Sequence, residues 1–235
     1  MCINFEDCRR PAVVVDHIKP FNQGGEFWDP GNHQAMCKSC HDRKTAKEPG
    51  GFSRFHTDNS HLDIKVALRQ NHLPRKKSLM VLDCYHGEGA IWNHIKRSTE
   101  KTIQVVGIDK RQIAGELQLR GDNLKFIRGL HLGIYDVIDL DTYGVPYGAL
   151  RAVLGNRTLK KGTAVFLTFI QTVYGRLPPD MLSDLGYSRE MVRKCRSLFS
   201  KNGFDKMKAF LGQSGVKKIA YISVNNKFYI HFNVE

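Results

Sequence analysis

The sequence predicts an α/β protein in which a small module precedes a doubly wound, mostly parallel sheet that ends in an antiparallel hairpin. Three observations lead to this prediction. Residues 1–48 are dense in Cys, His, Asp and Gly and show no long helical period. Residues 79–235 alternate short β-rich runs with helical stretches, which is the pattern of a parallel sheet. Two alternating runs flank Asn225-Asn226 and predict a terminal β-hairpin.

Within the larger module, five runs are predicted to form strands, and helices are predicted between most of them. The predicted strands are Leu79–Asp83, Gln104–Asp109, Lys125–Ile127, Tyr135–Leu140 and Ala164–Phe169. The hairpin is predicted at Lys218–Ser223 and Lys227–Val234.

Two breaks divide the chain. Glu48-Pro49-Gly50-Gly51 ends the first module, and the segment from Leu73 to Ser78 leads into the second. We therefore predict one domain over residues 1–50, a partly helical linker over 51–78 and a second domain over 79–235.

The charge distribution favours a polyanionic partner. The 235 residues carry a formal net charge of +13, and basic side chains that meet phosphates release condensed counterions. Residues 1–50 hold seven basic and seven acidic residues, so the excess lies further along the chain. Nucleic acid, and DNA first, is the expected partner. A candidate backbone-binding face is formed by Arg189, Arg193, Lys194, Arg196, Lys201, Lys206, Lys208, Lys217 and Lys218.

The chain contains no apolar run long enough to span a bilayer and no secretory signal at Met1-Cys2. We therefore expect a cytoplasmic protein without a membrane partner. In a reducing compartment its six cysteines argue against disulfides. Metal ligation is the better interpretation.

Four of these cysteines could close one tetrahedral zinc site. Cys2 and Cys8 lie about thirty residues before the tighter pair Cys37 and Cys40, whose C-x2-C spacing is typical of a zinc knuckle. The gap between Cys2 and Cys8 is looser than usual, which makes Cys2 the weakest of the four ligands. The alternative is a set of buried thiols without metal.

Between the two pairs lies a dense series of polar residues. Val15-Asp16-His17-Ile18-Lys19-Pro20 is followed by Gly24-Gly25, by Asn32-His33-Gln34 and by Cys40-His41-Asp42-Arg43-Lys44-Thr45. Over about residues 2–47 this series resembles the HNH endonuclease family, although His33 stands where an apolar residue is more common.

The resemblance implies a zinc-bound ββα-metal fold that hydrolyses DNA phosphodiesters. His17 would be the general base, Asp16 and His41 would hold a catalytic Mg²⁺ or Mn²⁺, and Asn32 would orient the loop bearing His17. Zinc would be a separate, structural ion. The alternative is a zinc knuckle that binds without hydrolysis.

A second series begins at a strand end. Asp83 precedes a turn with Gly87 and Gly89, and about twenty residues later Asp109 ends another strand with a carboxylate that could accept ribose hydroxyls. A dinucleotide site is less favoured, because Trp92 stands where the third glycine of its fingerprint would be.

Together these residues resemble the cofactor-binding face of class I S-adenosylmethionine-dependent methyltransferases, which have a Rossmann-like fold. The resemblance implies S-adenosylmethionine at Asp83, Gly87, Gly89 and Asp109, with Asp122 at the adenine edge.

A third series resembles the D-P-F-G-S-P motif of tRNA guanosine N2-methyltransferases. Asp141, Tyr143, Gly144 and Pro146 match, and Thr142 replaces a proline. The resemblance implies that Asp141 holds an exocyclic amine while Tyr143 stacks on a flipped base of DNA or RNA.

Three functions remain open: a nuclease fused to a nucleic-acid N-methyltransferase, a nuclease guided by a noncatalytic Rossmann-like binding domain, and a methyltransferase targeted by a zinc knuckle. By analogy, the first suggests phage, mobile-element or restriction-modification biology. The recognition sequence, nicking versus double-strand cleavage, the methylated atom and the oligomeric state stay open.

Overall fold

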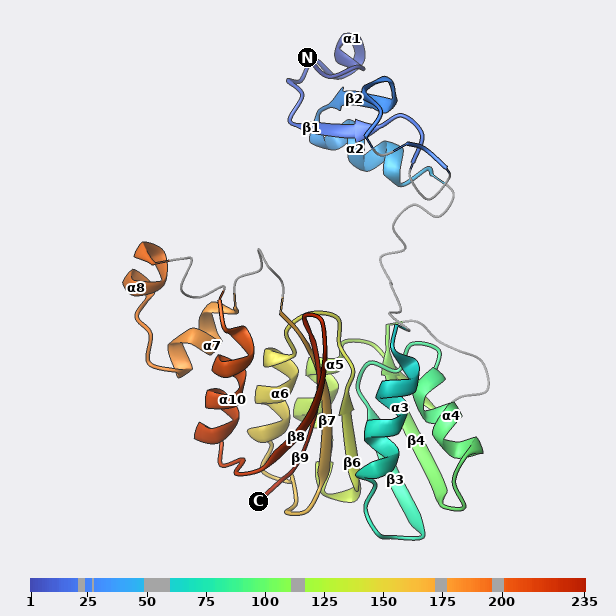
Figure 1. The fold of residues 1–235 in the computed structure, drawn as a ribbon, viewed down its shortest axis with the longest axis vertical. Coiled ribbons are helices and arrows are strands. Elements are labelled where there is room, and N and C mark those ends of the chain that lie inside the picture. Colours follow the sequence, from blue (N-terminus) through green and yellow to red (C-terminus); the bar gives the residue numbers. More distant parts are fainter. Residues whose placement is uncertain (21–23, 27, 49–59, 111–116, 172–176, 196–200) are drawn as a thin grey trace. The chain divides into compact units, whose positions relative to one another are not determined.

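The computed structural model describes residues 1–235 except 21–23, 27, 49–59, 111–116, 172–176 and 196–200. The chain divides into two compact units, unit 1 over Met1–Thr57 and unit 2 over Asp58–Glu235 (Figure 1).

Unit 1 is a β-hairpin with helices around it. Strands β1 (Val14–His17) and β2 (His33–Met36) pair antiparallel, with Asp16 opposite Gln34 and His17 opposite His33. The other elements among its described residues are α1 (Phe5–Cys8), the 3-10 turn η2 (Pro30–Asn32) and α2 (Lys38–Thr45), which contacts β1. The buried apolar cluster of this unit consists of three cysteines and Met36. Unit 1 thus consists mainly of two strands and a helix packed on a small core, as predicted for a ββα module.

Unit 2 is built on a seven-stranded sheet in the order β5-β4-β3-β6-β7-β9-β8. The first five strands along the chain run parallel, and β9 runs antiparallel to both of its neighbours. The predicted fold class, a mostly parallel Rossmann-like sheet with a C-terminal antiparallel hairpin, is confirmed. The strands are β3 (Ser78–Asp83), β4 (Thr102–Asp109), β5 (Gln118–Arg120), β6 (Val137–Leu140), β7 (Ala164–Ile170), β8 (Ile219–Val224) and β9 (Lys227–Asn233).

Helices cover both faces of this sheet. Side chains of β3 alternate between two buried apolar clusters, one on each face of the sheet. Val81 packs with α3 (Leu62–Asn71) and α4 (Ala90–Arg97), whereas Leu82 packs with the helices of the other face. The helices that contribute to the second cluster are α5 (Asn123–Gly129), α6 (Tyr147–Leu154), α7 (Pro179–Asp184) and α10 (Gly203–Gln213). The described part of the unit also contains η3 (Leu132–Ile134) and α8 (Arg189–Lys194).

One predicted strand is wrong. Lys125–Ile127 lies in α5, and the strand of this region is the preceding β5. The Asp122 side chain accepts a hydrogen bond from the Lys125 backbone N–H at 3.1 Å and so begins a helix, whose Ile127 is fully buried. The apolar run therefore packs as one helical turn.

The second unit also begins earlier than the sequence predicts. α3 lies within the predicted linker, yet it packs on the sheet with Val66 and Leu68 buried. Residues 49–59 of that linker lie outside the described residues.

Candidate functional site

The four cysteines of unit 1 come together. Cys2 precedes α1, Cys8 ends it, and Cys37 and Cys40 lie at the start of α2. Their sulfur atoms all lie within 4.8 Å of one another, and the Sγ atoms of Cys8 and Cys37 are 3.9 Å apart. Zinc at about 2.3 Å from four tetrahedral thiolates sets the sulfurs about 3.8 Å apart. The four cysteines could therefore hold one zinc ion.

The acidity of these thiols differs within the cluster. The Ser39 hydroxyl, 3.4 Å from Cys37 Sγ, lowers the pKa of that thiol to about 6. The contact with Cys37 raises the pKa of the Cys40 thiol to about 11. Adjacent thiolates repel each other, and a divalent cation among them relieves that repulsion.

A second polar cluster joins β1 to α2. One oxygen of Asp16 lies 3.0 Å from Lys44 Nζ and accepts a hydrogen bond from Gln34 Nε2 at 3.0 Å. The other oxygen lies 3.6 Å from His41 Nε2. Partial burial alone would raise the pKa of Asp16, but the bonds from Lys44 and Gln34 outweigh it and hold that pKa below its ordinary value. An ionised carboxylate oxygen beside an imidazole nitrogen is a donor set that fits a divalent cation.

His17, the last residue of β1, lies next to this pair in the chain. Alternation along β1 directs its ring to the face opposite Asp16. There it meets His33, with ring centroids 5.1 Å apart in an edge-on arrangement.

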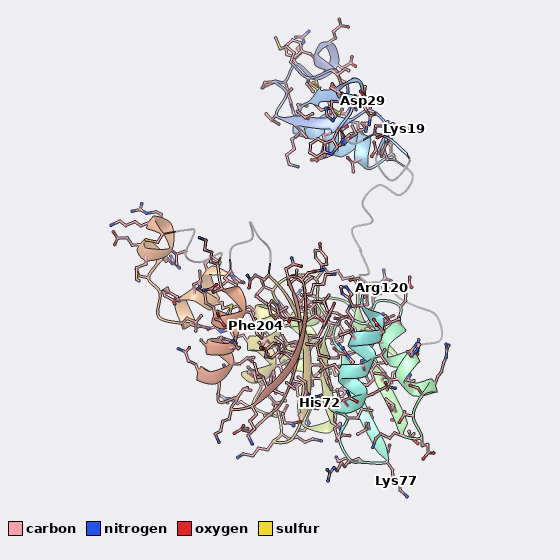
Figure 2. All side chains as sticks on the ribbon, viewed as in Figure 1. Lys19, Asp29, His72, Lys77, Arg120 and Phe204 are labelled. Atoms are coloured by element: carbon pink, nitrogen blue, oxygen red, sulfur yellow. The ribbon has the colours of Figure 1, made fainter. Side chains whose placement is uncertain are left out.

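The loop after His17 is held by Asn32. The Asn32 side chain accepts a hydrogen bond from Lys19 N at 2.8 Å and donates to Lys19 O at 3.0 Å and to Glu26 O at 2.9 Å. Gly25 is required here, because a Cβ at this position would lie 2.0 Å from Lys19 O. Lys19, labelled in Figure 2, thus stays in a fixed relation to the end of β1.

In unit 2 the strand order reverses between β3 and β6, and ligands of open α/β sheets bind beyond the carboxyl ends of the strands at such a point. Asp83 ends β3 and accepts from the Tyr85 backbone N–H at 3.3 Å, and its other oxygen lies 3.1 Å from His86 Nδ1. Asp109 ends β4 and accepts a hydrogen bond from Gly87 N at 2.9 Å. The predicted cofactor-binding residues of these two strands therefore share one edge of the sheet.

The glycine turn at this edge is partly filled by the chain itself. A Cβ at Gly107 would lie 2.5 Å from His86 Cγ, and one at Gly89 would lie 2.8 Å from His86 Cε1. The turn keeps positive φ angles at Gly87 and Gly89. The Asp109 carboxylate beside this glycine turn fits a ribose. The His86 side chain occupies the space next to Gly89 and Gly107. Asp122, predicted at the adenine edge, is exposed and serves as the N-cap of α5.

Asp141, the carboxylate predicted to bind an exocyclic amine, already has hydrogen-bond partners within the protein. Asp141 Oδ2 accepts from Lys65 Nζ at 2.7 Å, and Asp141 Oδ1 accepts from the Thr168 hydroxyl. The Lys65 side chain is only 5% exposed and that of Asp141 only 14%. Tyr143, the predicted stacking residue, is 71% exposed. With both carboxylate oxygens engaged, Asp141 does not fit an incoming amine in this arrangement.

Sequence reasoning did not find Lys65 or its neighbour Arg69. Arg69 binds both oxygens of the fully buried Asp139 at 2.6 Å each, and Trp92 Nε1 donates to the same carboxylate at 2.9 Å. Burial raises the pKa of Asp139, while the Arg69 guanidinium, bonded to both oxygens, opposes that rise by favouring the ionised carboxylate. The sequence signal that could have found them is their spacing: Lys65 and Arg69 lie four residues apart, among the apolar positions of one helix.

In fold class, unit 1 is a small ββα module whose four cysteines could bind a metal, and unit 2 is a Rossmann-like α/β domain. Residues 2–47 match the model of the HNH endonuclease family and form an HNH domain. Comparison with curated proteins gives no match.

Solved structures resemble most of the chain in fold. A protein of Bordetella parapertussis described as a possible exported protein is 14% identical, with a TM-score of 0.49, over 83% of this chain and 78% of that one. A SAM-dependent methyltransferase of Archaeoglobus fulgidus is 11% identical, with a TM-score of 0.47, over 77% and 96%. A precorrin-6y C5,15-methyltransferase of Geobacter metallireducens is 13% identical, with a TM-score of 0.43, over 77% and 91%. At these values the likeness assigns no residue role and no reaction to this chain.

Among the described residues, no helix has the length and apolar character that crossing a bilayer requires.

Proposed function

We propose that unit 1 is a metal-dependent nuclease that hydrolyses DNA phosphodiesters. The observation that carries this proposal is the pair formed by Asp16 Oδ1 and His41 Nε2, 3.6 Å apart, with the second Asp16 oxygen held by Lys44 and Gln34. Asp16 and His41 would hold Mg²⁺ or Mn²⁺, and the four cysteines would hold a structural zinc. The catalytic cation, when bound, neutralises charge on the scissile phosphate.

The protein supplies the base and its position. His17 accepts a proton from water through a ring nitrogen as the water oxygen forms a bond to phosphorus. One phosphorus–oxygen ester bond breaks, and the leaving oxygen takes a proton from solvent. Asn32 holds the backbone that follows His17, and Lys44 donates to the His17 carbonyl at 2.7 Å, so the histidine is fixed from both sides of the strand end.

The test is nicking of supercoiled plasmid with added Mg²⁺ or Mn²⁺. His17→Ala should abolish cleavage while zinc content and the unfolding transition stay as in the wild type. His94→Ala, at an exposed position of α4, is the matched control and should cleave normally. Nicking by His17→Ala at the wild-type rate removes His17 from the mechanism.

A second candidate function is binding of S-adenosylmethionine by unit 2. It is favoured by Asp109 and the Gly87 N–H meeting at the strand edge where the sheet order reverses. The cofactor would supply an electrophilic methyl group, and an exocyclic base amine of DNA or RNA would be its acceptor. For Asp141 and Tyr143 to hold that amine, the amine must replace Lys65 at Asp141.

Calorimetry with S-adenosylmethionine tests the binding step. Asp109→Ala should weaken binding, Asp141→Ala should keep most of it and abolish methyl incorporation into nucleic acid, and Asp63→Ala on the exposed side of α3 should change neither. If the wild type does not bind the cofactor at millimolar concentration, unit 2 is a noncatalytic nucleic-acid-binding domain. Cofactor binding without plasmid cleavage would instead support the methyltransferase targeted by a zinc knuckle.

A further inference from the structure

A cavity lies between α7 and α8 in unit 2, and none of the residues assigned to the two proposed reactions lines it. Its volume is about 350 Å³, within the range of about 300 to 1,000 Å³ that small-molecule sites occupy. The lining residues are Pro179, Asp180, Ser183, Tyr187, Arg189, Val192 and Arg193.

Helical spacing explains this lining. Asp180 and Ser183, three residues apart, share one side of α7. Arg189 and Arg193, four residues apart, share one side of α8, which begins at the Ser188 cap. Tyr187 lies in the short connection, where its backbone N–H donates to Leu182 O at 3.0 Å. One aromatic ring, two guanidinium groups, a hydroxyl and a carboxylate therefore border one cavity.

Three basic neighbours of the two arginines form local ion pairs. Lys194 pairs with Glu190 at 2.7 Å, Lys208 with Asp205 at 2.8 Å and Lys217 with Glu235 at 2.8 Å. Within the described part of the chain, no carboxylate forms an ion pair with Arg189 or Arg193 at 4.0 Å or closer. Among the described residues, the charges of Arg189 and Arg193 are thus not neutralised by an ion pair at the cavity that they line.

We propose that this cavity binds one unpaired nucleotide of single-stranded nucleic acid. Arg189 and Arg193 take the phosphate, because a guanidinium group matches phosphate oxygens with parallel donors. The Tyr187 ring stacks on the base, and the Asp180 carboxylate accepts from a base amine. A nucleotide fits this cavity better than an acidic peptide does, because the aromatic ring can meet its base while the two guanidinium groups meet its phosphate.

Nucleotide binding at this cavity requires neither DNA cleavage by unit 1 nor cofactor binding by unit 2. It would let unit 2 hold an unpaired strand even if both proposed reactions failed. Its failure can likewise be distinguished from theirs, since binding is measured on protein carrying His17→Ala without added divalent metal.

The experiment is fluorescence anisotropy of a short fluorescein-labelled single-stranded oligodeoxynucleotide, titrated over a range of salt concentrations. Arg189→Gln with Arg193→Gln should reduce the slope of log affinity against log salt by about 0.7, because one phosphate contact on a single strand contributes about 0.7. Tyr187→Leu should lower affinity about five- to 150-fold, the effect of one lost stacking contact, and leave the slope unchanged. Tyr187→Phe keeps the ring and should bind as the wild type does.

The matched control is Arg97→Gln with Arg128→Gln, which removes the same charge from exposed positions of α4 and α5. If this control lowers the slope as much as the cavity variant, the effect is general charge and the proposal is wrong. Unchanged binding by Tyr187→Leu also overturns it. Thermal unfolding of each variant shows whether a loss of binding reflects a loss of folding.

Discussion

Asn32 spans the loop between Lys19 and Glu26 with three hydrogen bonds, each between 2.8 and 3.0 Å. We predict that Asn32→Ala lowers plasmid cleavage at least about tenfold, which corresponds to about 1.4 kcal/mol of lost positioning. Asn123→Ala in unit 2 is the control. Zinc content should not change in either variant. Normal cleavage by Asn32→Ala would show that the loop holds its position without this side chain.

Lys65 and Asp141 form a second residue-scale test, because both are largely buried and each is the other's counter-ion. Removing one partner of a buried pair typically costs about 3 to 5 kcal/mol, whereas removing both can be close to neutral. We predict that Lys65→Met lowers the free energy of unfolding by about 3 kcal/mol and that adding Asp141→Leu restores most of it. Urea denaturation followed by the fluorescence of buried Trp92 measures the cycle. Additive losses would mean that the two charges do not stabilise each other.

The sequence could indicate the carboxylates of unit 2 but not their partners. Asp83, Asp109 and Asp141 follow strands, so a strand pattern places them at one edge of the sheet. Lys65 approaches Asp141 across 76 residues of chain, and no local pattern encodes that contact. The four cysteines, in contrast, were predictable as one cluster because thiol spacing around a metal is restricted.

At the scale of elements, the docking of α3 on β9 contains a histidine pair. His72 follows α3 (Figure 2) and stacks on His231 with ring centroids 4.4 Å apart, and Phe166 lies 4.8 Å from the same His231 ring. Burial, with the neighbouring His72, lowers the pKa of His231 to about 4. His231 is therefore neutral in the folded protein at neutral pH.

This lowered pKa gives a signed pH dependence. An unfolded histidine takes up its proton near pH 6.5, so the unfolded state gains protons first as the pH falls from about 6.5 to about 4. We predict that the lowered pKa of His231 reduces the free energy of unfolding by about 2 to 3 kcal/mol as the pH falls across this window. His231→Phe should remove this part of the pH dependence. Urea unfolding near pH 7 and near pH 4.5 compares the wild type with His231→Phe, and His94→Phe is the control. Equal pH dependence in His231→Phe and wild type would show that His231 titrates normally.

Elements with a strong local pattern were the ones that could be predicted. The β-hairpin around Asn225 has the expected turn, with Asn225 in the left-handed region at a φ of 54°, which asparagine tolerates. α5 was missed because a short apolar run fits a buried strand and a helical turn equally well, and the Asp122 cap decided between them.

At the scale of the whole molecule, the two units differ in what stabilises them. Among the described residues of unit 1, the buried apolar cluster consists of three cysteines and Met36, while Val13 and Val15 are 70% and 73% exposed. Unit 2 buries extensive apolar clusters on both faces of its sheet. Small modules with so little apolar burial generally need a metal to fold, and the four cysteines could hold one.

We therefore predict one zinc per chain by elemental analysis and two unfolding transitions by calorimetry. A strong chelator should abolish the transition of unit 1 and leave that of unit 2, followed by Trp92 fluorescence, unchanged. Cys37→Ser with Cys40→Ser should behave like the chelated protein. Negligible zinc in the wild type, or retention of zinc by this double variant, would contradict a four-thiolate site.

The place of β9 affects how the protein is made on the ribosome. β9 is the last strand along the chain, yet it lies between β7 and β8. The HNH residues 2–47 leave the ribosome roughly 190 residues before β9 is complete, an interval of about 10 to 40 s at about 5 to 20 residues per second. During translation β7 therefore keeps an unpaired edge, open to pairing with the wrong strand, after the HNH domain has had time to fold.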